Sequence, residues 1–335
     1  TKLTRPPQTQ SRYAAIPLRE VPECLKDTIL ERTDLLDIRR LRLLHELSLR
    51  GTLSDVAEAL HQSPSSISQA LSQLEREVGV PLLEKVGRRL RLTPAAEVLV
   101  EHTAVILARL EQATSDVAVQ SDEAAGTVRL AVFQSAASAF MPQMLTELAS
   151  RHPRLRVTMS QREPEQALYE TWLREFDLVI AEEYPGHAAR AYPDLHRAPL
   201  TTDLLRLAVP PTGDPWDRIA SVEDAADLPW TMEPEGTASR HWAEQLCRRA
   251  GFEPDVRFET DDLEAQIALI ENGNAVAILP DLMRVRRRPD VRVVDVDPRR
   301  RVVFTATRTA ISKTPAIVAC RAALASAVPA QLDVD

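Results

Sequence analysis

The residues whose types and spacing could do chemistry begin at Ser63-Pro64. A serine hydroxyl can cap free backbone amides and proline suits the first helical position, so this pair predicts the start of a helix. An apolar stripe follows at intervals of four, three and four residues, formed by Ile67, Leu71, Leu74 and Val78. The other side of the helix carries polar side chains without charge, which are Ser65, Ser66, Ser68, Gln69, Ser72 and Gln73.

Such a polar face has the chemistry of DNA recognition. A glutamine amide can form paired hydrogen bonds with adenine, and a serine hydroxyl can reach either a base edge or a phosphate. A helix that is merely solvated can show the same composition, so this face alone leaves both interpretations open.

The preceding segment predicts a second helix close by. It runs from Thr52 to Leu60, and Thr52 and Asp55 have the spacing of a capping box. Only His61 and Gln62 separate it from Ser63, so the two helices must cross at a steep angle. This is the geometry of a helix-turn-helix that places its second helix in the major groove.

A basic hairpin is predicted beyond the second helix. Gly79-Val80-Pro81-Leu82-Leu83 forms a turn, after which basic and apolar residues alternate around Gly87. A cationic hairpin beside a recognition helix can neutralise phosphates and orient the helix, although an ordinary charged hairpin looks the same. The basic residues are Lys85, Arg88, Arg89 and Arg91.

From Asp37 onward the chain resembles the LysR-type transcriptional regulators. The resemblance implies a winged helix-turn-helix over residues 35–93 that binds promoter DNA through Ser63, the polar helix face and the hairpin arginines. Two departures are Pro64, one position earlier than usual, and Ala96 in place of a glycine. The matching residues are Asp37-Ile38-Arg39-Arg40-Leu41, Leu60-His61-Gln62-Ser63, Ile67-Ser68-Gln69, Leu74-Glu75, Gly79-Val80-Pro81-Leu82, Gly87-Arg88-Arg89 and Leu92-Thr93.

Residues 94–120 are expected to form a long linker helix. Thr93-Pro94 supplies a start signal, and an apolar seam then alternates in steps of four and three, the spacing of a coiled coil. This stripe could pack on its own domain, but the resemblance implies dimerisation, as a homodimer or homotetramer. The seam residues are Leu99, Thr103, Ile106, Leu110, Ala113 and Val117.

Strand and helix patterns alternate over residues 127–330, which predicts a parallel sheet covered by helices. The resemblance implies a two-lobed α/β effector domain like the periplasmic binding proteins, within an α+β multidomain chain. Lobe I is expected at about 127–203 and 302–330, and lobe II at about 204–301. A small-molecule effector would bind between them.

Residues that match the cleft of the family follow the strands. They are Gln134, Ser135, Ala136, Thr201, Thr202, Gly236 and Thr237, with Asn274 as a weaker candidate. An acidic rim in nearby loops could select an effector that carries an amine, although loop carboxylates are usually just solvated. The rim residues are Glu182, Glu183, Asp203, Glu233, Glu235 and Asp261.

Charge and composition agree with this picture. The chain has 335 residues, of which 44% are hydrophobic, and a net charge of −8. Residues 37–93 carry nine Lys and Arg and seven Asp and Glu, so their net charge is +2 and the remainder is −10. A positive end would orient the approach to DNA.

Several function classes lack a signal. The sequence has no metal-binding histidine spacing and no phosphate-binding or nucleophile-elbow motif, so it indicates no class of enzyme. The alternative functions are a two-lobed α/β small-molecule-binding enzyme and a ligand-independent architectural DNA-binding protein. No cofactor is expected. Cys24, Cys247 and Cys320 stand far apart and no membrane-length apolar run occurs, which favours the cytoplasm. Residues 1–34 are expected to form a flexible extension, and RNA polymerase is a further partner left open.

Overall fold

The computed structural model describes residues 36–86, 89–120 and 123–329. The expected extension 1–34 and Arg88 lie outside them, and of Arg89 only the backbone is described. The chain divides into two compact parts within one long helix, Thr1–Leu107 and Ala108–Asp335. Each part is described by itself.

Three helices open the N-terminal part: α2 (Ile38–Arg50), α3 (Leu53–Ala59) and α4 (Pro64–Val78). Their starts follow the sequence signals. The Thr52 hydroxyl accepts a hydrogen bond from the Asp55 amide, and the Ser63 hydroxyl accepts one from the Ser66 amide, both at 3.2 Å. These bonds satisfy amides that an uncapped helix leaves free.

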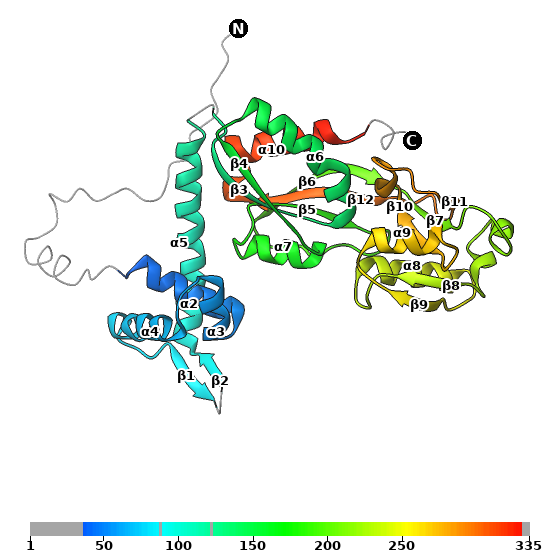
Figure 1. Ribbon diagram of the computed structural model, residues 1–335. Coiled ribbons are helices and arrows are strands. Elements are labelled where there is room, and N and C mark those ends of the chain that lie inside the picture. Colours follow the sequence, from blue (N-terminus) through cyan, green and yellow to red (C-terminus); the bar gives the residue numbers. More distant parts are fainter. Residues whose placement is uncertain (1–35, 87–88, 121–122, 330–335) are drawn as a thin grey trace, which may run out of the picture. The chain divides into compact units, whose positions relative to one another are not determined.

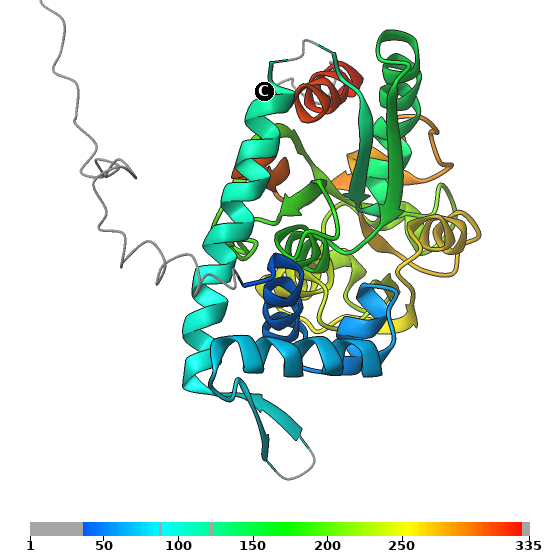
Figure 2. The same cartoon turned by 90° about the vertical axis from the view of Figure 1, so that its left-hand side faces the viewer.

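The core of this part is the apolar side of α4 packed on α2 and α3. Ile67, Leu71 and Leu74 are buried against Leu44 and Val56. Strands β1 (Leu83–Val86) and β2 (Arg89–Leu92) pair antiparallel and form a hairpin that projects away from the helices (Figure 2). The predicted helix-turn-helix with a hairpin is therefore present.

The turn before the hairpin is fixed by one half-buried carboxylate. Glu75 Oε1 accepts hydrogen bonds from the amides of Leu82 (2.8 Å) and Leu83 (3.0 Å). Helix α4 ends at Gly79, whose φ of 80° is the left-handed conformation that favours glycine. The hairpin therefore starts at a fixed position relative to α4.

Helix α5 (Pro94–Ala118) spans the boundary between the two parts. Three members of the expected seam, Ile106, Leu110 and Val117, are exposed. Thr103 is instead buried and its hydroxyl donates to the Leu99 carbonyl (2.7 Å). The expected seam is thus interrupted at Thr103, and the exposed side chains of Ile106, Leu110 and Val117 form an apolar surface on the helix.

The first lobe of the C-terminal part is built on a five-stranded sheet of order β4-β3-β5-β12-β6. β3 pairs parallel with β4 and β5, whereas β12 pairs antiparallel with β5 and β6. The expectation of a parallel sheet is therefore wrong for this lobe, because the returning strand enters it in the opposite direction. The strands are β3 (Gly126–Val132), β4 (Leu155–Gln161), β5 (Leu178–Glu183), β6 (Leu195–Asp203) and β12 (Arg301–Arg308).

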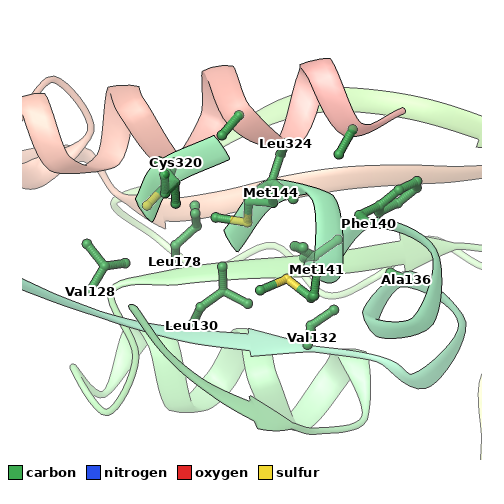
Figure 3. Packing of buried hydrophobic residues seen from close by; sticks show 14 of the residues in the cluster. Val128, Leu130, Val132, Ala136, Phe140, Met141, Met144, Leu178, Cys320 and Leu324 are labelled. Carbon is green, nitrogen blue, oxygen red and sulfur yellow. The ribbon is translucent and has the colours of Figure 1, made fainter. Parts of the chain in front are cut away.

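Helices cover both faces of this sheet (Figure 1). α6 (Gln134–Arg151) and α10 (Pro315–Ala327) lie side by side on one face, and α7 (Pro164–Trp172) packs on the other. Figure 3 shows Phe140 and Met144 of α6 and Leu324 of α10 packed over the strand residues Leu130 and Leu178. Removing such side chains from water supplies most of the stability of the lobe.

The second lobe contains the remaining strands and two helices. β7 pairs antiparallel with β10 and β11, so this sheet too is not parallel, while β8 and β9 form a parallel pair. Strands β6, β8 and β11 were not among the predicted elements. The elements are β7 (Leu205–Val209), β8 (Pro229–Met232), α8 (Ala238–Arg249), β9 (Asp255–Glu259), α9 (Leu263–Glu271), β10 (Ala277–Pro280) and β11 (Arg292–Asp295), with short 3-10 turns at Trp216–Arg218, Glu223–Ala225 and Asp281–Arg284. A further 3-10 turn, Thr309–Ile311, follows β12 in the first lobe.

The chain crosses between the lobes twice. It leaves the first lobe between Asp203, the last residue of β6, and Leu205, the first of β7, and returns between Asp295 and Arg301. Arg301 lies opposite Asp203 in the antiparallel register of β12 and β6. The two crossings therefore meet side by side, between the lobes.

Candidate DNA-binding and effector-binding sites

The outer face of α4 presents the predicted polar side chains. Ser65, Ser66, Ser68, Gln69 and Ser72 are all exposed. Ser63 is exposed too, but its hydroxyl already accepts from the Ser66 amide and lies 3.0 Å from the Ser65 hydroxyl. We therefore assign Ser63 first to capping the helix.

Gln73 lies differently from the other predicted contacts. Its side chain is half-buried, and Nε2 donates to Glu77 Oε1 at 2.9 Å. Glu77 in turn pairs with Arg40 of α2. The amide of Gln73 is thus engaged at the α2–α4 contact, so the helix face open to solvent is narrower than the sequence suggested.

The hairpin is basic where its side chains are described. Lys85 and Arg91 are exposed, and Arg91 lies 3.8 Å from Glu84 across the hairpin. An ion pair at this distance and exposure contributes at most about 1 kcal/mol, so it leaves the guanidinium able to contact a phosphate.

The C-terminal part contains a cavity of about 300 Å³ between its two lobes. This volume is at the lower end of the range for small-molecule sites. The wall is mixed: aromatic and aliphatic side chains alternate with carboxylates and two arginines. The lining residues include Ser135, Glu163, Glu182, Tyr184, Thr231, Glu233, Arg240, Trp242, Asp261 and Arg301.

Four of the seven predicted effector residues line this cavity, namely Gln134, Ser135, Gly236 and Thr237. The other three lie elsewhere. Ala136 is fully buried in the core of the first lobe. Thr201 and Thr202 lie in β6, where they pair with residues of the neighbouring strand β12, and they do not line the cavity. Asn274, the weaker candidate, also lies outside the cavity.

Gln134 connects the two lobes. Its Nε2 donates to Asp262 Oδ1 (2.9 Å) and its Oε1 accepts from the Leu263 amide (2.8 Å). The first bond holds the pKa of Asp262 below its ordinary value. One amide at the start of α6 thereby holds the start of α9 across the cavity.

Arg301 is the central cation of the site, and the sequence analysis did not find it. It is only 1% exposed, and its guanidinium donates to Asp203 Oδ2 (2.7 and 3.0 Å), to Glu182 and to the Ser135 hydroxyl (2.8 Å). Its charge also lies 5.3 Å from the centre of the Phe133 ring. Burial acts to lower the pKa of Arg301, but the two carboxylates outweigh it, so the arginine stays charged.

The carboxylates around Arg301 feel the same burial. Desolvation raises the pKa of Glu182 and of Asp203, and the arginine only partly offsets it. Glu233 has a pKa raised to about 8, first by burial and then by the charges of Glu163 and Glu182. The pKa of Glu163 is raised by burial and by Asp261. The cavity therefore holds more carboxyl groups than its two arginines can pair with.

Within the described ranges, no group of three or more His, Cys, Asp and Glu side chains could hold a metal ion. In the same residues no helix is long and apolar enough to cross a bilayer.

A winged helix-turn-helix module in one chain with a two-lobed domain that holds a ligand-sized cavity defines a DNA-binding protein that responds to a small molecule. Residues 38–97 match the model described as bacterial regulatory helix-turn-helix protein, lysR family, and residues 121–329 match the LysR substrate binding domain. The chain belongs to the LysR family of transcription regulators.

Individual relatives cover most of the chain. It is 27% identical over 248 residues to the transcriptional dual regulator GltC of Bacillus subtilis, which covers 73% of this chain and 81% of GltC. It is 25% identical to the malonate utilization transcriptional regulator of Klebsiella pneumoniae, over 76% and 82% of the two chains. A full-length OxyR variant from Pseudomonas aeruginosa superimposes with a TM-score of 0.60 at 19% identity, over 87% of this chain and 98% of that one.

Family membership decides between the classes of protein that the sequence left open, namely a regulator, an enzyme and an architectural DNA-binding protein. The protein is a sequence-specific DNA-binding transcription regulator whose second domain binds a small-molecule effector. Neither alternative, a two-lobed enzyme or an architectural DNA-binding protein, finds support among the matches.

Proposed function

We propose that the exposed face of α4 reads an operator in the major groove. Its base-reading residues are Ser65, Ser66, Ser68, Gln69 and Ser72, with Gln73 and Ser63 in supporting positions. We propose that Arg88, Arg89 and Arg91 of the hairpin segment contact the flanking phosphates. The observation that carries this proposal is a capped, well-packed α4 with an uncharged polar outer face beside a basic hairpin.

We propose further that the effector occupies the cavity between the lobes, near Gln134, Ser135, Gly236 and Thr237. An effector that binds there can change DNA binding only by the difference in its affinity for two arrangements of the protein. Gln134 is well placed to sense it because its bonds join the lobes. No organic or metal cofactor is part of this proposal.

The exposed apolar side chains of α5 support assembly through that helix, and we propose a homodimer or homotetramer. Two copies would present two recognition helices to a two-fold symmetric operator. The proposed domains are 35–93 for DNA binding, 94–120 for dimerisation and 127–330 for the effector, with residues 1–34 as an extension. We place the protein in the cytoplasm, with RNA polymerase as a further partner.

The cysteines do not support a thiol switch. Some relatives are named hydrogen peroxide-inducible genes activators. In this chain Cys247 and Cys320 are buried, and burial raises the pKa of each thiol to about 12. Peroxide reacts with exposed thiolates, so these two positions lack the needed form. Cys24 lies outside the described residues.

Gln69→Ala should relax base preference rather than abolish binding. A glutamine that pairs with one base contributes about 1–3 kcal/mol of discrimination at that position. Selection of bound fragments from genomic DNA, followed by titration of single-base variants, measures the loss. Gln161→Ala, at an exposed position of β4 outside the cavity, is the control. If Gln69→Ala leaves the preference unchanged at every position, the proposed α4 contact is wrong.

Arg91→Ala should weaken binding to all DNA sequences to a similar extent. Loss of one phosphate contact also reduces the slope of log affinity against log salt by about one. Binding to operator and to unrelated DNA at several salt concentrations checks both effects. Arg156→Ala, an exposed arginine in the effector-binding part, serves as the control. An unchanged salt slope for Arg91→Ala would remove the hairpin from the interface.

A further inference from the structure

Three carboxylates of the cavity between the lobes lack a partner. Glu163, Glu233 and Asp261 line it, and their side chains form no ion pair or hydrogen bond with any part of the chain that the structure describes. They act on one another instead, since the charges of Glu163 and Asp261 both raise the pKa of Glu233. Mutual repulsion without a cation is an arrangement that a bound cation would relieve.

The arginines of the cavity cannot supply that cation. Arg301 is shared between Glu182 and Asp203. Arg240 pairs with Glu244 and lies 3.7 Å from Glu259, and its Nη1 donates to the backbone carbonyl of residue 233 rather than to the carboxylate. Both positive charges are therefore matched by carboxylates other than the three free ones.

Two residues that line the cavity, Thr231 and Trp242, each have a buried polar atom without a hydrogen-bond partner among the described residues. Thr231 Oγ1 and Trp242 Nε1 have no hydrogen-bond partner, although both side chains are more than nine-tenths buried. Leaving a buried donor unpaired costs about 1–3 kcal/mol, so such atoms call for an acceptor from a ligand. An indole N–H can only donate, which means that the missing partner carries a hydrogen-bond acceptor.

Aromatic rings add a surface that favours a cation. Trp242 and Tyr184 lie with their ring centres 6.3 Å apart, and both line the cavity. The face of an aromatic ring attracts a positive charge. Carboxylates and aromatic rings in the lining of one cavity complement an ammonium group rather than a carboxylate.

We propose that the effector of this regulator is a small organic amine that binds as its ammonium form against Glu233 and Glu163 and carries a hydrogen-bond acceptor toward Thr231 and Trp242. This inference rests on the proposed effector function of the cavity and specifies the ligand class. Amino acids and amino alcohols have both groups, and organic acids without an amine have only the second.

Binding of the amine should depend on pH. The charged groups that face Glu233 are Glu163, Glu182, Asp261 and Arg301. Burial and the three carboxylates raise the pKa of Glu233 to about 8, against the opposing charge of Arg301. An ammonium ion beside it favours the carboxylate, so binding releases a proton. Below pH 8 affinity should therefore rise with pH, by up to about tenfold per unit.

The test is calorimetric titration of the full-length protein with matched probes. The panel contains the standard amino acids, aminobutanol and γ-aminobutyrate, together with glutarate, shikimate and butanediol, which lack an amine. At least one amine should bind at millimolar concentration or better, about tenfold or more tighter than glutarate or butanediol. Binding by acids alone would overturn the amine assignment and keep the effector site. Binding by none would overturn both, while operator binding tests the DNA interface separately.

Variants give the proposal a second readout. Glu233→Gln and Glu163→Gln keep the shape of the side chain and should each weaken the best amine by about tenfold or more. Glu233→Gln should also remove the pH dependence. Glu223→Gln, an exposed carboxylate of the same lobe outside the cavity, is the matched control. Unchanged amine affinity in both cavity variants, with normal thermal melts, would overturn the assignment.

Discussion

Replacing Arg301 by methionine should destabilise the effector-binding part by about 3–5 kcal/mol, the cost of breaking a buried ion pair by removing one partner. The loss follows from what remains. Asp203 is fully buried and Glu182 nearly so, and both would keep a desolvated carboxylate without its cation. The Ser135 hydroxyl would lose its donor as well. Urea unfolding of the full-length protein, followed in the transition of this part, measures the effect.

Neutralising the two carboxylates that lose their cation should recover much of the stability lost in Arg301→Met. In the Arg301→Met background, Glu182→Gln and Asp203→Asn replace the carboxylates by neutral groups of the same shape. Arg156→Met, on an exposed arginine of β4, should change stability by less than about 0.5 kcal/mol. If Arg301→Met costs no more than this control, the arginine does not hold the crossing strands together.

The DNA-binding part could be predicted from the sequence because its signals are local. Helix caps at Thr52 and Ser63 act within three residues, and the apolar stripe of α4 is set by helical periodicity alone. These features need no knowledge of distant neighbours. The exception is Gln73, which periodicity placed on the outer face. Its amide reaches Glu77 because Glu77 is held by Arg40 of another helix, and that contact is long-range.

The lining of the cavity between the lobes was only half predictable, because part of it again depends on long-range contacts. Positions directly after a strand or before a helix, such as Ser135 and Thr237, could be found through the resemblance to the family, and both line the cavity. Arg301 depends on the pairing of two strands almost a hundred residues apart, and it is the last of three consecutive arginines in the sequence. The register Arg301–Asp203 was the signal that could have found it. Without β6 as a predicted strand, that register could not be drawn.

The mixed sheets illustrate how pairing direction escapes local patterns. Alternating strands and helices favour parallel pairing, and β3, β4 and β5 obey this. β12 returns from the second lobe and enters between β5 and β6 in the opposite direction. Apolar periodicity is the same for a parallel and an antiparallel neighbour, so only the chain path decides.

Glu233→Gln should stabilise the ligand-free protein at about pH 8 by up to about 5 kcal/mol, since each unit of pKa shift corresponds to about 1.4 kcal/mol. The pKa of this carboxyl is raised from 4.5 to about 8 by burial and by neighbouring carboxylates. Between these values the folded protein keeps a proton that the unfolded chain has lost. The free energy of unfolding therefore falls as pH rises through this window, and glutamine removes that loss.

Urea unfolding across this pH range checks the sign. At about pH 4 the Glu233 carboxyl is largely protonated in both the folded and the unfolded protein, so wild type and Glu233→Gln should have similar stability. The difference should grow toward pH 8, whereas Glu223→Gln should follow the wild type throughout. A variant no more stable than wild type at pH 8 would mean that Glu233 is already ionised and stabilised in the empty cavity. The gain in stability and the loss of amine affinity have one origin, since the burial and the repulsion that disfavour the Glu233 carboxylate in the empty protein are what a bound ammonium offsets.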